Sequence, residues 1–344
     1  MQEQETTFRL IRAALDGKPP YLGTTPMETS QWWSLFRLMR VNHVAALVAD
    51  TVAALDVPRE VKIPWLAERE KAVRWHRYQA EVQQDIIDHM ERHGIDTLVL
   101  KGSHVAQYYP RPEEREFGDL DLYFYDRHDE ADRVAREELK VEVGNDAHHH
   151  SKYNYRGVTV ESHYDFVNTH YPPSNHRYEA LLKEAAPSPT FEVLFLLRHM
   201  ACHFASSRIT LRDLVDWTLT CRALQGQVDW ERVQRVTDDY GMTAFVSALD
   251  GIAERQLGYR PPLRSTGGPD NVGNIRQLER DIVYGSPETA DKHADGLARL
   301  PWKLRRWKAQ TWKRRMVFSD SEPTLLLTSL TSHAEKPQSI LHKM

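Results

Sequence analysis

Two acidic residues alternate with leucines in the stretch from Asp119 to Leu122, which reads Asp-Leu-Asp-Leu. Side chains in a β-strand alternate between its two faces, so this stretch predicts a strand with Asp119 and Asp121 on one face. Two like charges held close together are unfavourable unless a cation lies between them. Carboxylate oxygens are hard ligands that suit Mg²⁺ or Mn²⁺, so the pair predicts a divalent metal site.

A third carboxylate follows in a later predicted strand. Two β-compatible runs, residues 148–155 and 158–164, are joined through Gly157 and predict a hairpin. In the second run Glu161 and His163 share one face, opposite the valines of the same strand. A glutamate that faces inward from a strand is costly to bury unless it is paired or bound to a metal. Glu161 is therefore a candidate third ligand beside the two aspartates.

A turn that suits phosphate precedes these strands. Lys101, Gly102 and Ser103 follow a short apolar run and precede a predicted helix that extends to Tyr109. Glycine lets the backbone approach an anion closely, and a helix N-terminus offers free N–H groups. Ser103 adds a hydroxyl donor and Lys101 a positive charge. Such a turn is common by itself, but next to three carboxylates it predicts phosphoryl or nucleotidyl transfer from a nucleotide.

These motifs together resemble the DNA polymerase β-like nucleotidyltransferase superfamily, and more narrowly the bacterial nucleotidyltransferase family proteins. The resemblance is carried by Leu-Lys-Gly-Ser from Leu100, by Asp-Leu-Asp-Leu from Asp119, and by Val-Glu-Ser-His-Tyr from Val160. A helical pattern that begins at Arg198 and continues to Asp216 is similar to the family's helical domain. The resemblance extends over about residues 30–300 and is most specific between residues 98 and 164.

The resemblance implies a metal-dependent transfer of a nucleoside monophosphate from a nucleoside triphosphate to a hydroxyl acceptor, with release of pyrophosphate. It implies Mg²⁺ (or Mn²⁺) as cofactor, ATP as the expected triphosphate, and a small molecule, peptide, protein or RNA end as acceptor. The implied catalytic and metal-binding residues are Asp119, Asp121 and Glu161. The implied substrate-binding residues are Lys101, Gly102, Ser103, Arg115, His163 and His199.

The chain departs from the superfamily pattern in two respects. The spacer between Ser103 and Asp119 holds 15 residues, a little longer than the general pattern, although this length is typical of the subfamily. The third carboxylate is a glutamate, Glu161, where aspartate is commoner. The longer side chain still reaches a metal, so we expect an active enzyme. A non-catalytic nucleotide-sensing module is the alternative, and it would have no need of three clustered carboxylates.

A basic and aromatic stripe occupies residues 299–315, where eight lysines and arginines are interleaved with Trp302, Trp307 and Trp312 and no acid occurs. The stripe could contact nucleic acid or an anionic surface. Contact with RNA would favour an RNA-directed, toxin-like nucleotidyltransferase. Packing of the tryptophans on the protein with solvated arginines explains it equally well.

The remaining histidines and cysteines support no separate chemistry. His199 and His203 have zinc-ligand spacing on a helix, but no matching third ligand follows, so a polar network near the nucleotide is favoured. In the run His148-His149-His150, strand alternation lets either His149 or the other two face the site; a substrate contact and an exposed strand remain equally open. Cys202 and Cys221 are expected to be buried where helices pack against one another.

These elements predict an α+β fold, a small mixed β-sheet nucleotidyltransferase core flanked by N-terminal and C-terminal helical regions. The expected divisions are a helical region over residues 1–93, the catalytic core over 94–187, a helical domain over 188–300, and a basic aromatic helix and tail over 301–344. A short strand is expected at residues 141–143 and a loop at 258–273.

The composition sets limits on the class of protein. The 344 residues have 41% hydrophobic and 27% charged residues and a formal net charge of −4, which argues against indiscriminate coating of nucleic acid. Two cysteines are too few for a disulfide framework. The N-terminus lacks the features of a signal peptide, and no apolar run reaches membrane-spanning length. We therefore expect a cytoplasmic protein with no membrane partner.

Overall fold

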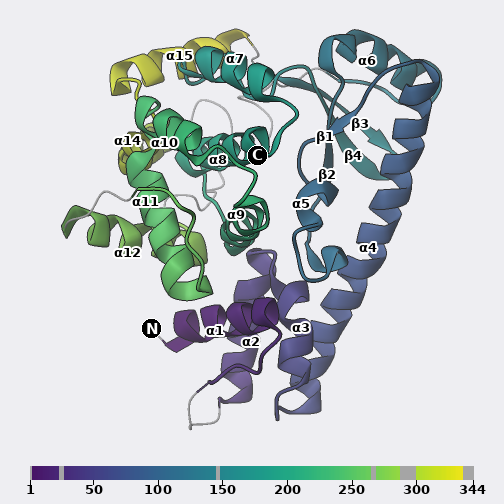
Figure 1. The fold of residues 1–344 in the computed structure, drawn as a ribbon. Helices are drawn as coiled ribbons and strands as arrows, with labels where there is room; N and C mark the ends of the chain where they lie inside the picture. The colour runs from purple at the N-terminus through teal and green to yellow at the C-terminus, as the bar shows by residue number, and fades with distance from the viewer. Residues whose placement is uncertain (1, 23–26, 145–147, 265–268, 287–299, 336–344) are drawn as a thin grey trace.

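The computed structural model describes residues 2–22, 27–144, 148–264, 269–286 and 300–335. It is a mixed α+β structure in which a small four-stranded sheet lies among helices, as the sequence predicts (Figure 1). Within these residues, no helix combines the length and the apolar character that a membrane span requires.

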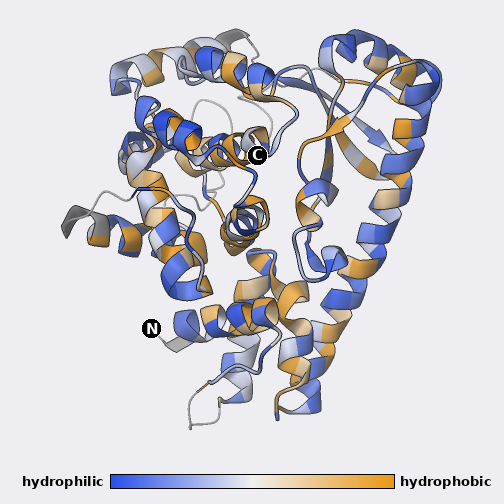
Figure 2. Ribbon diagram, in the orientation of Figure 1, coloured by the Kyte–Doolittle hydropathy of each residue, from blue (hydrophilic) through white to orange (hydrophobic). Residues whose placement is uncertain are grey.

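In the described residues, four helices precede the sheet. They are α1 (Gln2–Asp16), α2 (Thr29–Val41), α3 (Ala45–Ala53) and α4 (Arg59–Arg92). Helix α4 holds 34 residues and extends from α3 to the sheet (Figure 1). It begins five residues before the predicted start near Pro64, because a proline this close to a helix N-terminus removes one backbone hydrogen bond without ending the helix. Hydrophilic residues predominate along α4, with hydrophobic residues at intervals (Figure 2).

The sheet contains β1 (Leu98–Val99), β2 (Asp119–Tyr123), β3 (His150–Tyr155) and β4 (Val158–His163), in the order β1-β2-β4-β3. Strands β2 and β4 are parallel, and the other two pairs are antiparallel. The predicted hairpin is present as β3–β4. The strand predicted at residues 141–143 is wrong, because only an isolated bridge from Gly144 to Lys152 forms there. Val141 instead donates its N–H to Ala135 at the end of the preceding helix.

The two faces of the sheet meet different surroundings. Leu120, Leu122, Val158 and Val160 are buried in one core with α4 and with α6 (His128–Glu137). On the opposite face Tyr123 packs against Phe166, which contacts Phe191 of α8 (Pro189–Ser206). The predicted carboxylates lie on this second face, since strand side chains alternate. The site therefore opens toward the C-terminal helices.

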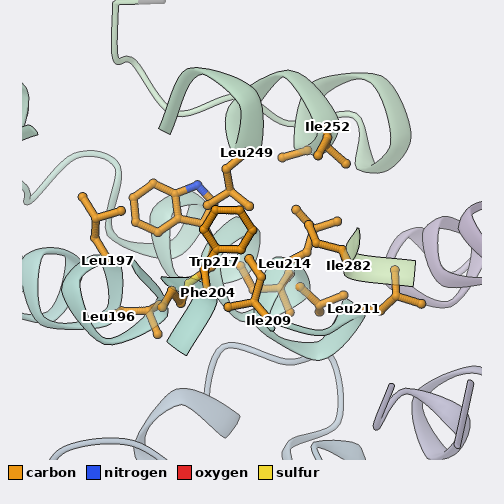
Figure 3. Close-up of a cluster of buried hydrophobic side chains, with 14 of the residues drawn as sticks. Leu196, Leu197, Phe204, Ile209, Leu211, Leu214, Trp217, Leu249, Ile252 and Ile282 are labelled. Atoms are coloured by element: carbon orange, nitrogen blue, oxygen red, sulfur yellow. The ribbon is translucent and has the colours of Figure 1, made fainter. Parts of the chain in front are cut away.

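The C-terminal part is helical. Its elements are α7 (Asn175–Ala185), α8 (Pro189–Ser206), α9 (Leu211–Leu224), α10 (Trp230–Asp239), α11 (Thr243–Ile252) with a π-helical extension (Ala253–Leu257), α12 (Pro269–Tyr284), α13 (Leu300–Ala309), α14 (Thr311–Val317) and α15 (Glu322–Glu335). Their buried side chains form the cluster in Figure 3, around Trp217 and Phe204. Cys221 is buried, as expected, and Cys202 is partly buried. The predicted loop at 258–273 is wrong for residues 269–273, where α12 begins at a proline that suits the first helical turn; residues 265–268 lie outside the described part.

The same core continues into the N-terminal helices. Phe8, Trp32 and Leu47 belong to one buried cluster with the residues around Trp217. The two helical regions therefore pack against each other rather than against the sheet alone. The division of the chain into four segments remains a prediction.

The basic aromatic stripe, as far as the structure describes it, is partly internal. Lys313 is fully buried, and its Nζ lies 2.6 Å from a carboxylate oxygen of Asp281. The guanidinium of Arg314 is buried over the ring of Trp307, 3.8 Å from the centroid, and pairs with Glu322. These contacts favour packing over nucleic-acid binding for this half of the stripe.

A buried acid in the C-terminal core makes stability dependent on pH. Asp250 accepts a hydrogen bond of 2.8 Å from Nε1–H of Trp217. Burial raises its pKa to about 7, above that of the same carboxyl in the unfolded chain. Between about pH 4 and pH 7 the folded state therefore holds a proton that the unfolded state has released. The stability that this group contributes is present below that window and is lost as the pH rises through 7.

We expect Asp250→Asn to remove this loss, because the amide stays neutral and still accepts from Trp217. The gain in the free energy of unfolding at pH 8 should exceed the gain at pH 5 by about 2–3 kcal/mol. Urea unfolding at the two pH values measures the difference. Asp239→Asn, on the exposed end of α10, is the control and should show no such dependence. A gain for Asp250→Asn that is equal at both pH values would contradict the prediction.

Candidate functional site

The carboxylates meet on two neighbouring strands. Asp121 of β2 and Glu161 of β4 are register partners in the parallel ladder, and Asp119 is the partner of Thr159. Residues paired in this way present their side chains on the same face of the sheet. The Asp121 side chain is 1% exposed and the Glu161 side chain 15% exposed. The structure thus places all three predicted carboxylates on one sheet face.

A lysine neutralises part of this charge. Lys101 follows β1, and its Nζ lies 2.9 Å from Oδ1 of Asp121. The same Nζ lies 3.3 Å from Nε2 of His199, which comes from α8. Lys101 therefore connects the sheet to the C-terminal helices across the site. Two of the residues that the sequence predicts to bind substrate are therefore neighbours in space.

The neighbouring charges shift the pKa values of Asp121 and Glu161 in opposite directions. Burial would raise the pKa of Asp121, but Lys101 and a hydrogen bond with His163 hold it well below its usual range. Burial and the charge of Asp121 raise the pKa of Glu161. Burial would lower the pKa of Lys101, but Asp121 and Asp119 outweigh this effect and raise it. Two carboxylates whose pKa values diverge are typical of acid–base sites.

The donor atoms suit a divalent metal. One ligand atom each of Asp121, Glu161 and His163 lies within 4.8 Å of the other two. Nε2 of His163 is 3.2 Å from Oδ1 of Asp121. Two carboxylates fit Mg²⁺ or Mn²⁺, and the imidazole favours Mn²⁺ of the two. Asp119 lies on the same face, close enough to influence the pKa of both Lys101 and Glu161.

The predicted phosphate turn has a specific backbone requirement. Gly102 has φ +60°, and a Cβ there would lie 3.2 Å from the ring of Phe117, so glycine is needed. Helix α5 (Ser103–Ala106) ends earlier than the predicted Tyr109. The Ser103 hydroxyl donates to Oε1 of Gln83 in α4 at 2.6 Å. Phosphate binding by Gly102 and Ser103 remains a prediction.

Arg115 has a different environment from the one expected. Its side chain is 4% exposed, and its guanidinium donates two hydrogen bonds to Asp216 of α9, at 2.8 and 2.7 Å. A further hydrogen bond of 3.0 Å reaches the carbonyl of Gly102. The hydroxyl of Tyr109 donates to the same carboxylate at 2.6 Å. These contacts favour a positioning role for Arg115, which supports the Gly102 turn, over the predicted contact with phosphate.

The paired histidines of α8 behave as the sequence favours. The rings of His199 and His203 are 4.3 Å apart at their centroids. Burial, together with Lys101, lowers the pKa of both rings, so they remain neutral. Among the described residues, neither belongs to a group that could hold a metal. The polar network predicted near the nucleotide is consistent with this arrangement.

The histidine run contributes more than strand alternation suggests. His150 is 9% exposed and lies beside His163, with ring centroids 5.0 Å apart. His149 also contacts His163, because β3 begins only at His150 and alternation does not apply before it. The exposed-strand interpretation is therefore wrong for both residues. The run of three histidines indicated a possible contact with the site. Which of the rings face the site depends on where β3 begins, at His150.

The contacts of the other residues of the site could not be predicted from the sequence, although Asp216 lies in the helical pattern that resembles the family's helical domain. Gln83 lies in the middle of a long helix, and its contact with Ser103 depends on how α4 crosses the sheet. Tyr109 and Asp216 are 107 residues apart in the chain. Only the tertiary arrangement brings these side chains to the Gly102 turn.

Comparison with known proteins gives one result. The family described as "uncharacterised nucleotidyltransferase" matches residues 28–258, which is more than half of the chain. The matched range includes the whole sheet and every side chain of the site described above. No curated protein and no solved structure matches the chain.

Proposed function

Because the chain belongs to this uncharacterised nucleotidyltransferase family, we propose that it transfers a nucleoside monophosphate from a nucleoside triphosphate to a hydroxyl acceptor. The observation that carries the proposal is the set of three carboxylates on one face of the β2–β4 pair, with Lys101 at 2.9 Å from Asp121. Burying clustered negative charge costs folding free energy unless a cation or a catalytic role requires it, and a module that only binds nucleotide does not need three carboxylates.

In the proposed reaction the acceptor oxygen attacks the α-phosphorus and forms a new phosphoester bond. The bond between the α-phosphorus and its bridging oxygen breaks, and pyrophosphate leaves with the electron pair. Glu161 accepts the proton of the acceptor hydroxyl, a role that its raised pKa favours. Lys101 binds the triphosphate charge beside Asp121.

The proposed metal ligands are Asp119, Asp121 and Glu161, with His163 next to Asp121. Bound Mg²⁺ or Mn²⁺ would neutralise triphosphate charge and lower the pKa of the acceptor hydroxyl. Arg115 holds the carbonyl of Gly102 and so fixes the turn that faces the phosphates. ATP is the expected triphosphate, and the acceptor is a small molecule, a peptide, a protein side chain or an RNA end.

Label transfer tests the proposal directly. Purified protein is incubated with each of four α-labelled nucleoside triphosphates, Mg²⁺ or Mn²⁺, and a cell extract as the source of acceptor. We expect label in an acceptor fraction together with equimolar pyrophosphate, and no transfer from γ-labelled triphosphate. Binding of triphosphate with no release of pyrophosphate under any of these conditions would favour a nucleotide-sensing module instead.

Lys101→Met should weaken triphosphate binding more than it slows the chemical step. Charge-assisted hydrogen bonds contribute about 1.5–3 kcal/mol, so KM for the triphosphate should rise about 10- to 100-fold. Steady-state kinetics separates KM from kcat. Lys71→Met, at an exposed position of α4, is the matched control. An unchanged KM in the Lys101 variant would show that this lysine serves only to neutralise Asp121.

A further inference from the structure

Three histidines gather where β3 begins and β4 ends, on the sheet face of the carboxylates. His150 and His163 are register partners in the antiparallel β3–β4 ladder, and His149 immediately precedes β3. The ring centroid of His149 lies 4.5 Å from that of His150 and 5.4 Å from that of His163. One nitrogen of each ring lies within 4.8 Å of the other two.

Two of these rings present nitrogen atoms that no other group satisfies. In the part of the chain that the structure describes, Nδ1 of His149 and Nδ1 of His150 are buried and have no hydrogen-bond partner. A buried polar atom without a partner costs about 1–3 kcal/mol. Two such atoms in adjacent rings indicate a place for a bound group.

The third ring is held as metal-binding histidines usually are. Nδ1 of His163 lies 3.2 Å from the carbonyl oxygen of Asp165. A carbonyl only accepts, so Nδ1 carries the proton and donates it. Nε2 then points toward Oδ1 of Asp121 at 3.2 Å and Oε2 of Glu161 at 3.8 Å. A backbone carbonyl that fixes the far nitrogen is the usual second contact of a histidine ligand.

We propose that His149, His150 and His163 form a binding site for one divalent transition-metal ion, for which Zn²⁺ is the best match. Imidazole nitrogens suit Zn²⁺ and Co²⁺, whereas Mg²⁺ requires oxygen ligands. Oε1 of Glu161 lies 3.6 Å from Nε2 of His150 and is within reach as a fourth ligand. Ligand atoms on one tetrahedral zinc ion lie about 3.4 Å apart. Shifts of about 1 Å in the histidine nitrogens, which small side-chain rotations allow, would therefore complete the site.

The ion would join the segment before β3 to the end of β4. It would also add positive charge beside Asp121 and Glu161, next to the proposed triphosphate site. This site shares Glu161 and His163 with the carboxylate site and differs from it by the nitrogens of His149 and His150. The proposal does not require the protein to be a nucleotidyltransferase, so it can hold or fail independently of the proposed function.

Cobalt binding provides the test. Tag-free protein of all 344 residues is stripped of metal with a chelator and titrated with Co²⁺. Binding is measured by the visible d–d absorption that four- or five-coordinate Co²⁺ produces, and Zn²⁺ is then added as a competitor. We expect wild-type protein to develop the absorption band and Zn²⁺ to abolish it. His149→Ala and His150→Ala should each lower the Co²⁺ affinity at least roughly 100-fold. His89→Ala on α4, outside both groups of metal-binding side chains, should leave the band unchanged.

X-ray absorption on zinc-loaded wild-type protein gives a measurement that needs no variant. Scattering from three imidazole rings on the bound ion would support the site. Absence of Co²⁺ and Zn²⁺ binding, or a bound zinc with only oxygen neighbours, would overturn it. Binding that survives the two histidine variants but is lost in Asp121→Asn would also overturn it, because the ion would then occupy the carboxylate site alone.

Discussion

Replacing Asp119 or Asp121 with asparagine is expected to abolish transfer of label from an α-labelled triphosphate. Asparagine keeps the size of the side chain but removes the negative charge that a divalent ion requires. Both residues lie on the β2 face that carries the site, and Asp121 also pairs with Lys101 at 2.9 Å. We expect the rate to fall at least about 1,000-fold in each variant.

The loss should be specific to the chemistry. Asp121→Asn removes a buried charge whose partners are Lys101 and His163, so the free energy of unfolding of this variant is measured alongside activity. Asp119 is less buried, and its variant should fold as well as the wild type. Asp129→Asn, on the exposed face of α6, is the matched control and should retain full activity. Undiminished transfer in either site variant would rule out the proposed mechanism.

Removing one partner of the buried ion pair between Arg115 and Asp216 is expected to destabilise the protein strongly. The two side chains are 4% and 2% exposed and share two hydrogen bonds, and Asp216 also accepts from Tyr109. A charge left in this environment without its partner costs about 3–5 kcal/mol. Arg115→Met and Asp216→Leu should each lower the free energy of unfolding by this amount, as measured by urea denaturation.

The double variant separates the pair from the individual charges. Since it leaves no unpaired buried charge, its loss of stability should be well below the sum of the two single losses. Arg133→Met provides the comparison, because its pair with Glu137 on α6 is exposed and should contribute less than about 1 kcal/mol. Additive effects of Arg115→Met and Asp216→Leu would show that the two residues do not act as a pair.

The same ion pair connects stability to the site. Arg115 also donates to the carbonyl of Gly102, so its loss should release the turn that is proposed to face the phosphates. Under conditions where the double variant is fully folded, we expect label transfer to remain below that of the wild type. Recovery of full activity together with recovered stability would show that Arg115 has no role in positioning the turn.

Local patterns were sufficient to predict the core of the site. Alternation of Asp119 and Asp121 with leucines identified a strand and the face its carboxylates share, and the hairpin around Gly157 placed Glu161 on a second strand. These features depend only on the two-residue period of a strand and on turn chemistry, which neighbouring residues decide. The same reasoning failed at residues 141–143, where apolar and polar residues alternate but no strand pairs with them and only an isolated bridge forms at Gly144.

Residue types and their spacing predicted the candidate site residues, namely the three carboxylates, Lys101 and Gly102. Long-range packing makes β2 and β4 parallel neighbours, which puts Asp121 beside Glu161, and it brings His149 and His150 next to His163. It also decided that Arg115 is bound to Asp216, 101 residues away, rather than free for a phosphate. The reason is physical: strand order and buried ion pairs depend on long-range packing, on which short-range periodicity carries no information.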